Sequence, residues 1–337
     1  MKAIRYGTVL VTAGIVFCTM SLSQALDVDK PVQQAMKKLK AEKADRGLLV
    51  LTNATYVRMS GQCPLPVLER VQDLTGCTVG RGNLLFFQRP QHHALRIMLF
   101  KKDTADAVIL SLDQNRIISE SVCMDMKHIS REEFWEKAGK LSCGKDIFTL
   151  VTLANAWVRG APYDFLKCAE LHNHLCPGVT SGYLIARYIL KKFPLKNGEK
   201  YVMISSPVWC KEEAFPVVLG CSPGRRDMVV KPLSSEQVKN VSVKRPAGMV
   251  LIWNSTKKTG KGIALQFDFA TLLDGRKGAD MSRMQKAIAA IKLVRSLNSP
   301  EKYVKSAAEF EVTEAVYNQL LNAGTNPYQA AGLLKKP

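Results

Sequence analysis

The sequence predicts an α+β protein of two related lobes, each a mainly antiparallel sheet with packed helices. The chain has 337 residues, which is too long for one small module. Hydrophobic residues make up 47% and charged residues 23%, a balance that excludes wholly disordered chains and multi-span membrane proteins. A unit of strand, helix, Gly-Cys turn and further strands occurs twice, with Cys77 in one turn and Cys221 in the other. Such an internal repeat predicts two lobes of similar fold.

The first 25 residues have the pattern of a secretory signal peptide. Two basic residues precede an apolar run over residues 8–22, and a small-x-small exit places the cut between Ala25 and Leu26. The run is shorter than the roughly 20 residues that span a bilayer. We therefore expect a periplasmic or secreted protein with no stable membrane span after cleavage; the alternative is an uncleaved N-terminal anchor.

The first lobe is predicted to cover residues 26–145. Its strands are indicated by β-branched and aromatic residues. The expected elements, in order, are a helix over 32–43, a strand within 46–57, a helix over 64–74, the turn Gly76-Cys77-Thr78-Val79-Gly80, strands at 84–88, 94–100 and 107–112, and a helix over 132–141.

The second lobe is predicted to cover residues 146–325, and residues 326–337 are expected to form a loose tail. Its turn, Gly220-Cys221-Ser222-Pro223-Gly224-Arg225, matches the first turn in chemistry and spacing. The expected elements are helices over 147–159 and 177–190, a strand at 201–205, a helix over 211–218, the turn, strands at 228–230, 248–253 and 263–269, and helices over 281–296 and 312–321.

The densest chemical stretch lies at residues 168–178. In an extended segment His172, His174 and Cys176 point to the same side. Pro177 suits the first turn of a helix, so Cys176 is expected at a helix N-terminus, where the dipole favours its thiolate. Imidazole and thiolate together suit Zn²⁺ or another borderline-soft divalent metal. A reactive thiol and structural histidines beside a buried or bridged cysteine remain open as interpretations.

Two further cysteines extend this candidate site. A short helix separates Cys210 from Cys221, so the two approach each other, as a disulfide, or approach the His/Cys stretch as ligands. Glu212 and Glu213 open that helix and are interpreted as partners of its dipole rather than as acid or base catalysts. The candidate metal ligands are therefore His172, His174, Cys176, Cys210 and Cys221.

The connection between the lobes offers two weaker features. Cys123 and Cys143 are candidates for a local disulfide. His128 stands near Cys123 and Asp125 as a second candidate ligand, although a structural role is favoured for it.

The charge of the chain suggests an anionic partner. Lys+Arg 48 against Asp+Glu 29 gives a formal charge of +19. Glycine turns with free amides and guanidiniums can hold an anion, or they are simply solvated. The lysines are scattered rather than interleaved with aromatic residues, so nucleic acid is not an expected partner of an exported chain. The candidate anion-binding residues are Gly80 and Arg81 in the first turn and Gly224, Arg225 and Arg226 in the second.

The stretch His172-Asn173-His174-Leu175-Cys176-Pro177-Gly178, followed by Gly182, resembles the formylmethanofuran dehydrogenase FmdE family. That family opens its first long helix with His-Gly-His-x-Cys-Pro-Gly, and Asn173 replaces the glycine here. Cys210 and Cys221 match the two later cysteines of the family. The resemblance covers residues 165–270 well and 47–112 in part. The first lobe keeps the family turn at 75–84 but lacks the His/Cys opening. The resemblance implies an α+β core and a metal-binding cleft.

These observations predict an exported metal-binding protein with its working site in the second lobe and zinc as the favoured ion. Three protein ligands would permit catalysis and four would indicate storage or structure, so no reaction is assigned. One alternative is a module that binds an anionic small molecule or cofactor between the lobes. Another is a thiol-disulfide protein that uses Cys176 or the Cys210/Cys221 pair. Either a monomer of two lobes or a homodimer fits the repeat.

Overall fold

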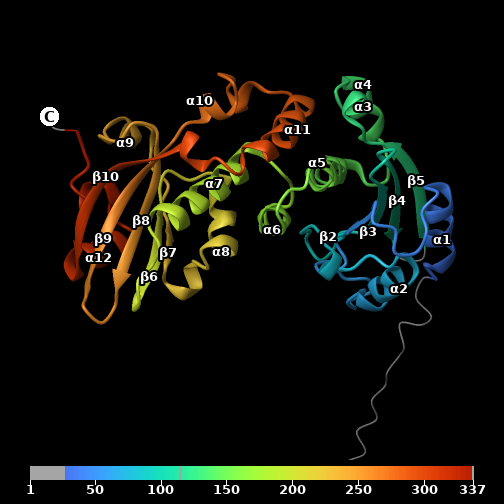
Figure 1. The fold of residues 1–337 in the computed structure, drawn as a ribbon, viewed down its shortest axis with the longest axis horizontal. Helices are drawn as coiled ribbons and strands as arrows, with labels where there is room; N and C mark the ends of the chain where they lie inside the picture. The colour runs from blue at the N-terminus through green and yellow to red at the C-terminus, as the bar shows by residue number, and fades with distance from the viewer. Residues whose placement is uncertain (1–26, 114–115, 336–337) are drawn as a thin grey trace, which may run out of the picture.

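The computed structural model describes residues 27–113 and 116–335, so the predicted signal peptide and its cut lie outside the described residues. Two five-stranded sheets, each with packed helices, stand at opposite ends of an elongated molecule (Figure 1). This arrangement confirms the predicted α+β class and the two similar lobes. No helix in the described ranges is long and apolar enough to cross a membrane.

The first sheet has the strand order β2-β1-β3-β4-β5. β1 runs parallel to β2, and the other neighbouring pairs are antiparallel. All five residues of β1 are buried, as expected for a strand covered on both faces. The strands are β1 (Leu48–Thr52), β2 (Leu84–Phe86), β3 (Leu95–Lys101), β4 (Asp106–Asp113) and β5 (Arg116–Cys123).

The second sheet repeats this topology. Its order is β10-β9-β8-β6-β7, with β6 parallel to β7 and antiparallel to β8. Each of its strands thus takes the place of the strand five earlier in the chain. The strands are β6 (Glu199–Ser205), β7 (Met228–Val230), β8 (Pro246–Asn254), β9 (Thr259–Phe267) and β10 (Val304–Thr313).

Equivalent helices cover one face of each sheet. In the first lobe α1 and α2 bury residues such as Val32 and Val71 against β1. In the second lobe α7 and α8 bury Ile185 and Phe215 against β6. In the chain, α1 precedes β1 and α2 follows it, and likewise α7 precedes β6 and α8 follows it. The helices are α1 (Asp29–Lys38), α2 (Leu65–Thr75), α7 (Pro177–Lys192) and α8 (Ala214–Val218).

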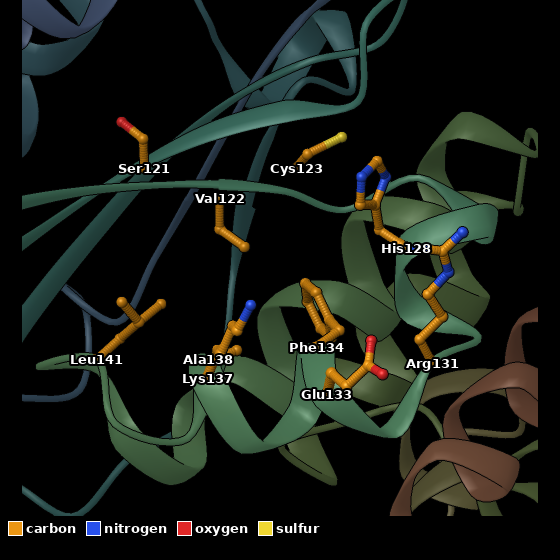
Figure 2. A pocket seen from close by; sticks show the side chains of 10 residues that line it. All are labelled: Ser121, Val122, Cys123, His128, Arg131, Glu133, Phe134, Lys137, Ala138 and Leu141. Carbon is orange, nitrogen blue, oxygen red and sulfur yellow. The ribbon is translucent and has the colours of Figure 1, made fainter.

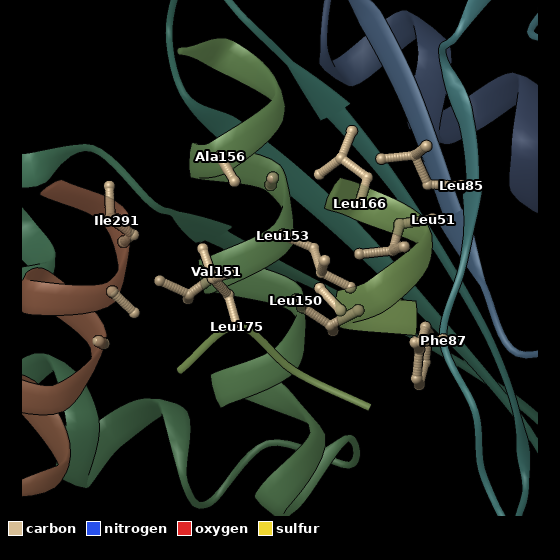
Figure 3. Packing of buried hydrophobic residues seen from close by; sticks show 14 of the residues in the cluster. Leu51, Leu85, Phe87, Leu150, Val151, Leu153, Ala156, Leu166, Leu175 and Ile291 are labelled. Carbon is tan, nitrogen blue, oxygen red and sulfur yellow. The ribbon is translucent and has the colours of Figure 1, made fainter. Parts of the chain in front are cut away.

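The other face of the first sheet is covered by the connection between the lobes. Leu51 and Leu85 of the sheet pack against Leu150 of α5 and Leu166 of α6 (Figure 3). Ile291 of α11, which belongs to the second half of the chain, joins the same core. The helices of this connecting core are α3 (Met126–Ile129), α4 (Glu132–Ala138), α5 (Ile147–Val158), α6 (Tyr163–Leu171) and α11 (Arg283–Lys292). Residues 147–171, assigned to the second lobe from the sequence, therefore pack on the first sheet.

The other face of the second sheet is covered by the C-terminal segment. Leu320 and Tyr328 are fully buried there against β6 and β8. The Tyr328 hydroxyl donates a hydrogen bond of 2.7 Å to the Ser206 carbonyl. Much of the expected loose tail is therefore ordered. The remaining helices are α9 (Ser235–Lys239), α10 (Phe269–Leu272), α12 (Glu314–Leu321) and α13 (Pro327–Ala330).

The two Gly-Cys turns share several hydrogen bonds. The Cys77 thiol donates to the Leu48 carbonyl and the Cys221 thiol to the Tyr201 carbonyl, both at 3.5 Å. Both thiols are buried, so burial raises the pKa of Cys77 to about 11 and that of Cys221 to about 12. The position equivalent to Asn83, whose side chain accepts from the Thr78 amide, is Asp227 in the second turn. These cysteines tie their turns to β1 in the first lobe and to β6 in the second.

Candidate metal centre

The His/Cys stretch forms the turn between α6 and α7. His172 follows the last residue of α6, and Asn173 reverses the chain with a positive φ of 74°. Cys176 is the N-cap of α7, and its sulfur accepts a hydrogen bond of 3.4 Å from the Val179 amide. Pro177 begins the helix, as the sequence predicts. The turn places His172 and Cys176 beside each other, with 3.3 Å between Nε2 and Sγ.

Two glycines of α7 bring a second segment against this turn. The short 3-10 helix at Cys210–Glu213 crosses α7 in backbone contact. A Cβ added to Gly178 would lie 2.8 Å from the Cys210 Cβ, and one added to Gly182 would lie 2.3 Å from the Lys211 carbonyl oxygen. Only glycine permits so close an approach. These two positions therefore determine how near Cys210 comes to Cys176.

The result is a compact group of three potential ligands. His172, Cys176 and Cys210 each offer one ligand atom within 4.8 Å of the others, and all three are part-buried. Glu213 stands beside them, with its Oε1 3.6 Å from the His172 Nδ1. The other carboxylate oxygen of Glu213, Oε2, is buried and has no hydrogen-bond partner among the residues that the structure describes. A buried oxygen of this kind is costly unless a proton or a cation satisfies it.

Glu213 was not identified from the sequence as part of the site. Its place at the start of a helix suggested only a partner of the helix dipole. Its signal was the spacing to Cys210, because residues three apart lie on one side of a helical turn. Whether Cys210 and Glu213 face His172 depends on how their 3-10 helix packs against α7, a contact between segments distant in the sequence.

The members of the site have opposed pKa shifts. Hydrogen bonds from Cys176 and His172 lower the pKa of Cys210, while the hydrogen bond with Cys210 and burial raise that of Cys176. Burial opposes protonation of His172, but its bonds to Cys210 and Glu213 outweigh burial and raise its pKa to about 9. These shifts favour the charged forms of His172, Cys210 and Glu213 beside one another. Binding of a divalent cation would displace protons from His172 and Cys176.

The donor set fits a borderline-soft divalent ion. Two thiols and an imidazole are the ligand types that suit Zn²⁺ and its neighbours, and the unpartnered Glu213 oxygen marks the place as one that favours a cation. Three protein ligands would leave one coordination position open.

Two predicted ligands lie outside this group. The His174 ring is 4.5 Å from the His172 ring between centroids and packs edge-on against Phe148 at 5.3 Å. Burial first, and then the charges of His172 and Arg89, lower the pKa of His174 to about 4. Cys221 is held in its own turn by Tyr201. Cys210 and Cys221 have the spacing of the two family cysteines, but only Cys210 lies in the ligand group.

The predicted disulfides are not formed. All eight cysteines of the described residues are free, including the Cys210/Cys221 and Cys123/Cys143 pairs. Cys143 is buried in the connecting core, and Cys123 stands part-buried at the end of β5.

A chain of hydrogen bonds links the first lobe to the His/Cys turn. Arg89 is buried and contacts Asp146 at 2.6 Å and the Thr149 hydroxyl at 3.0 Å. The Thr149 hydroxyl in turn donates 2.7 Å to the carbonyl of Asn173, the reversing residue of the His/Cys turn. Nothing in the sequence identified these contacts, which join residues far apart in the chain.

The candidate anion-binding turns differ between the lobes. Arg81 lines a cavity of about 440 Å³ together with Arg46, Asn83 and Trp157. Arg225, its equivalent, instead lies 3.3 Å from the Asp227 carboxylate. The glycines Gly80 and Gly224 have nothing within 4 Å of an added Cβ, and Arg226 has a positive φ of 57°.

One protein-family model matches the chain. It is described as "FmdE, Molybdenum formylmethanofuran dehydrogenase operon" and covers residues 171–322, a segment that contains all three clustered ligands and Glu213. No curated protein matches the sequence.

Proposed function

Because the chain belongs, through residues 171–322, to the FmdE family, we propose that it is an exported metal-binding protein whose site lies in the second lobe. One observation carries this proposal: His172, Cys176 and Cys210 offer three ligand atoms within 4.8 Å of one another. The unpartnered Oε2 of Glu213 supports it, because that oxygen needs a positive partner.

Zinc is the ion we propose. It is redox-inert and binds thiolate and imidazole together. A signal peptide would deliver the chain to an oxidising compartment, where neighbouring thiols form disulfides unless they are protected. A bound ion would protect Cys176 and Cys210, which are both free here.

The chain's own residues have distinct parts in this proposal. His172, Cys176 and Cys210 hold the ion, and Glu213 orients the imidazole through Nδ1, as carboxylates commonly do for metal-bound histidines. Gly178 and Gly182 keep the two segments in register. A divalent ion with an open position supplies a Lewis acid.

Metal content tests this proposal. In protein purified without chelator or added metal, Cys176→Ala or Cys210→Ala should lower the zinc content by about one ion per chain, because a ligand is lost. His174→Ala and Cys221→Ala should retain this ion, since both residues lie outside the ligand group. Elemental analysis reads the stoichiometry, and circular dichroism verifies that each variant is folded.

Two results would contradict it. Equal metal content in the wild type and the Cys176→Ala variant would show that Cys176 is not a ligand. Recovery of metal-free protein with Cys176 and Cys210 disulfide-bonded would favour the thiol-disulfide alternative.

A second candidate function is anion binding by the first lobe. Arg46 and Arg81 line one cavity with Trp157, and within the described ranges neither guanidinium forms an ion pair. In the second lobe Asp227 replaces Asn83 and neutralises Arg225. An anionic ligand with a ring would meet both guanidiniums and the indole.

Calorimetric titration with phenyl phosphate, and with inorganic phosphate for comparison, tests this candidate. Arg81→Ala should weaken binding about tenfold or more, because a hydrogen bond to a charged group is lost. Arg225→Ala is the matched control and should change nothing. Absence of binding, or an equal loss in both variants, would count against the first-lobe cavity.

A further inference from the structure

A second group of ligand-type side chains lies in the first half of the chain. Cys123 is the last residue of β5, and Asp125 and His128 follow it at the entrance of α3. Each offers one ligand atom, and these atoms lie within 4.8 Å of one another. The Nδ1 of His128 is 2.8 Å from the Asp125 carboxylate. Thiol, carboxylate and imidazole thus come together within six consecutive residues.

The local backbone holds this group in place. Asp125 caps α3 by accepting a hydrogen bond of 2.6 Å from the His128 amide. Cys123 is paired across the sheet with Asp106 of β4, and its thiol is 3.8 Å from the Thr104 carbonyl. Two carboxylates therefore stand near the thiol, which favours a cation there.

The group borders a cavity of about 330 Å³. Cys123 and His128 stand together at one end of it, with the thiol directed toward the imidazole, while Phe134 and Leu141 line its apolar part (Figure 2). A metal ion held by the group would thus have space on its cavity side for a water molecule or a small exogenous ligand.

We propose that Cys123, Asp125 and His128 form a second site for a borderline-soft divalent metal ion. The three donor types suit Zn²⁺, Co²⁺ or Ni²⁺. The site is separate in sequence from the His172/Cys176/Cys210 group and uses none of its residues. Its existence does not depend on the proposed function of the second lobe.

Cobalt titration separates the two sites. In a Cys176→Ser/Cys210→Ser variant the thiolates of the second-lobe site are gone, so a thiolate-to-cobalt absorption band has to come from another cysteine. The variant should still bind about one Co²⁺ per chain with such a band. Adding Cys123→Ser should abolish the band, and Asp125→Asn, which can still cap α3, should weaken binding about tenfold or more.

Each outcome decides the proposal. A Co²⁺ band that survives Cys123→Ser, or no Co²⁺ binding by a folded Cys176→Ser/Cys210→Ser variant, overturns it. If that double variant fails to fold, the same titration of the single Cys123→Ser and Cys123→Ala variants should show one Co²⁺ fewer per chain than the wild type. Failure of the second-lobe proposal would instead leave the double variant and the wild type with equal cobalt content.

Discussion

Replacing Gly182 with alanine should lower the free energy of unfolding by about 3 kcal/mol, although alanine is usually the better helix residue by about 1 kcal/mol. The reason is the contact between α7 and the 3-10 helix at Cys210–Glu213. The new Cβ would lie 2.3 Å from the Lys211 carbonyl oxygen and 2.6 Å from its Cα, which are backbone atoms that cannot rotate away. Urea unfolding followed by circular dichroism gives the measurement.

The matched control is Gly80→Ala. Nothing lies within 4 Å of a Cβ added there, and its φ is not positive, so little change is expected. In the Gly182→Ala variant the metal affinity should decrease together with the free energy of unfolding, because displacement of Lys211 also moves the neighbouring Cys210. A Gly182→Ala protein as stable as the wild type would show that the two segments are not in backbone contact.

Replacing Lys211 with methionine should cost about 3–5 kcal/mol of unfolding free energy, because it leaves a buried carboxylate without its cation. The Lys211 side chain is fully buried, contacts Glu212 at 2.6 Å and lies 3.7 Å from the centroid of the Trp209 ring. It also donates to the Pro207 carbonyl. Adding Glu212→Gln should restore most of the loss, since no uncompensated charge then remains.

The pH dependence of the same lysine gives an independent measurement. Burial, opposed by Glu212, lowers the pKa of Lys211 to about 8 from its usual 10.5. Between these values the unfolded chain binds a proton that the folded chain does not, so this group makes stability rise with pH. The contribution should be missing from the Lys211→Met/Glu212→Gln variant. A stability profile unchanged by the double substitution over that range would contradict a buried, weakly basic lysine.

The sequence predicted most strands of the two sheets but missed one edge strand in each, β5 and β10. β3 and β8 are rich in β-branched and other apolar residues and were expected. β5 and β10 mix polar and charged residues with apolar ones at a sheet edge, so they lack the continuous apolar signal of the buried strands. Their pairing depends on neighbours that a local pattern does not contain.

The same division holds for the site. The spacing of His172 and Cys176 and the proline after them located the turn and the start of α7 correctly. The position of Cys210 relative to Cys221 could not be read from spacing, because it depends on which thiol faces Gly178. Neither Glu213 nor the support from Arg89 had a local signal strong enough to assign a role.

The connecting core has a consequence for how the molecule moves. Its apolar interior includes Leu51 from the first sheet, Leu150 from α5 and Ile291 from α11, so neither half of the chain completes this interior by itself. We expect the two halves to unfold in one cooperative transition rather than as independent domains. Thr149 of the connecting core holds the Asn173 turn by a hydrogen bond. A hinge motion between the halves would therefore shift the position of His172, which adjoins that turn.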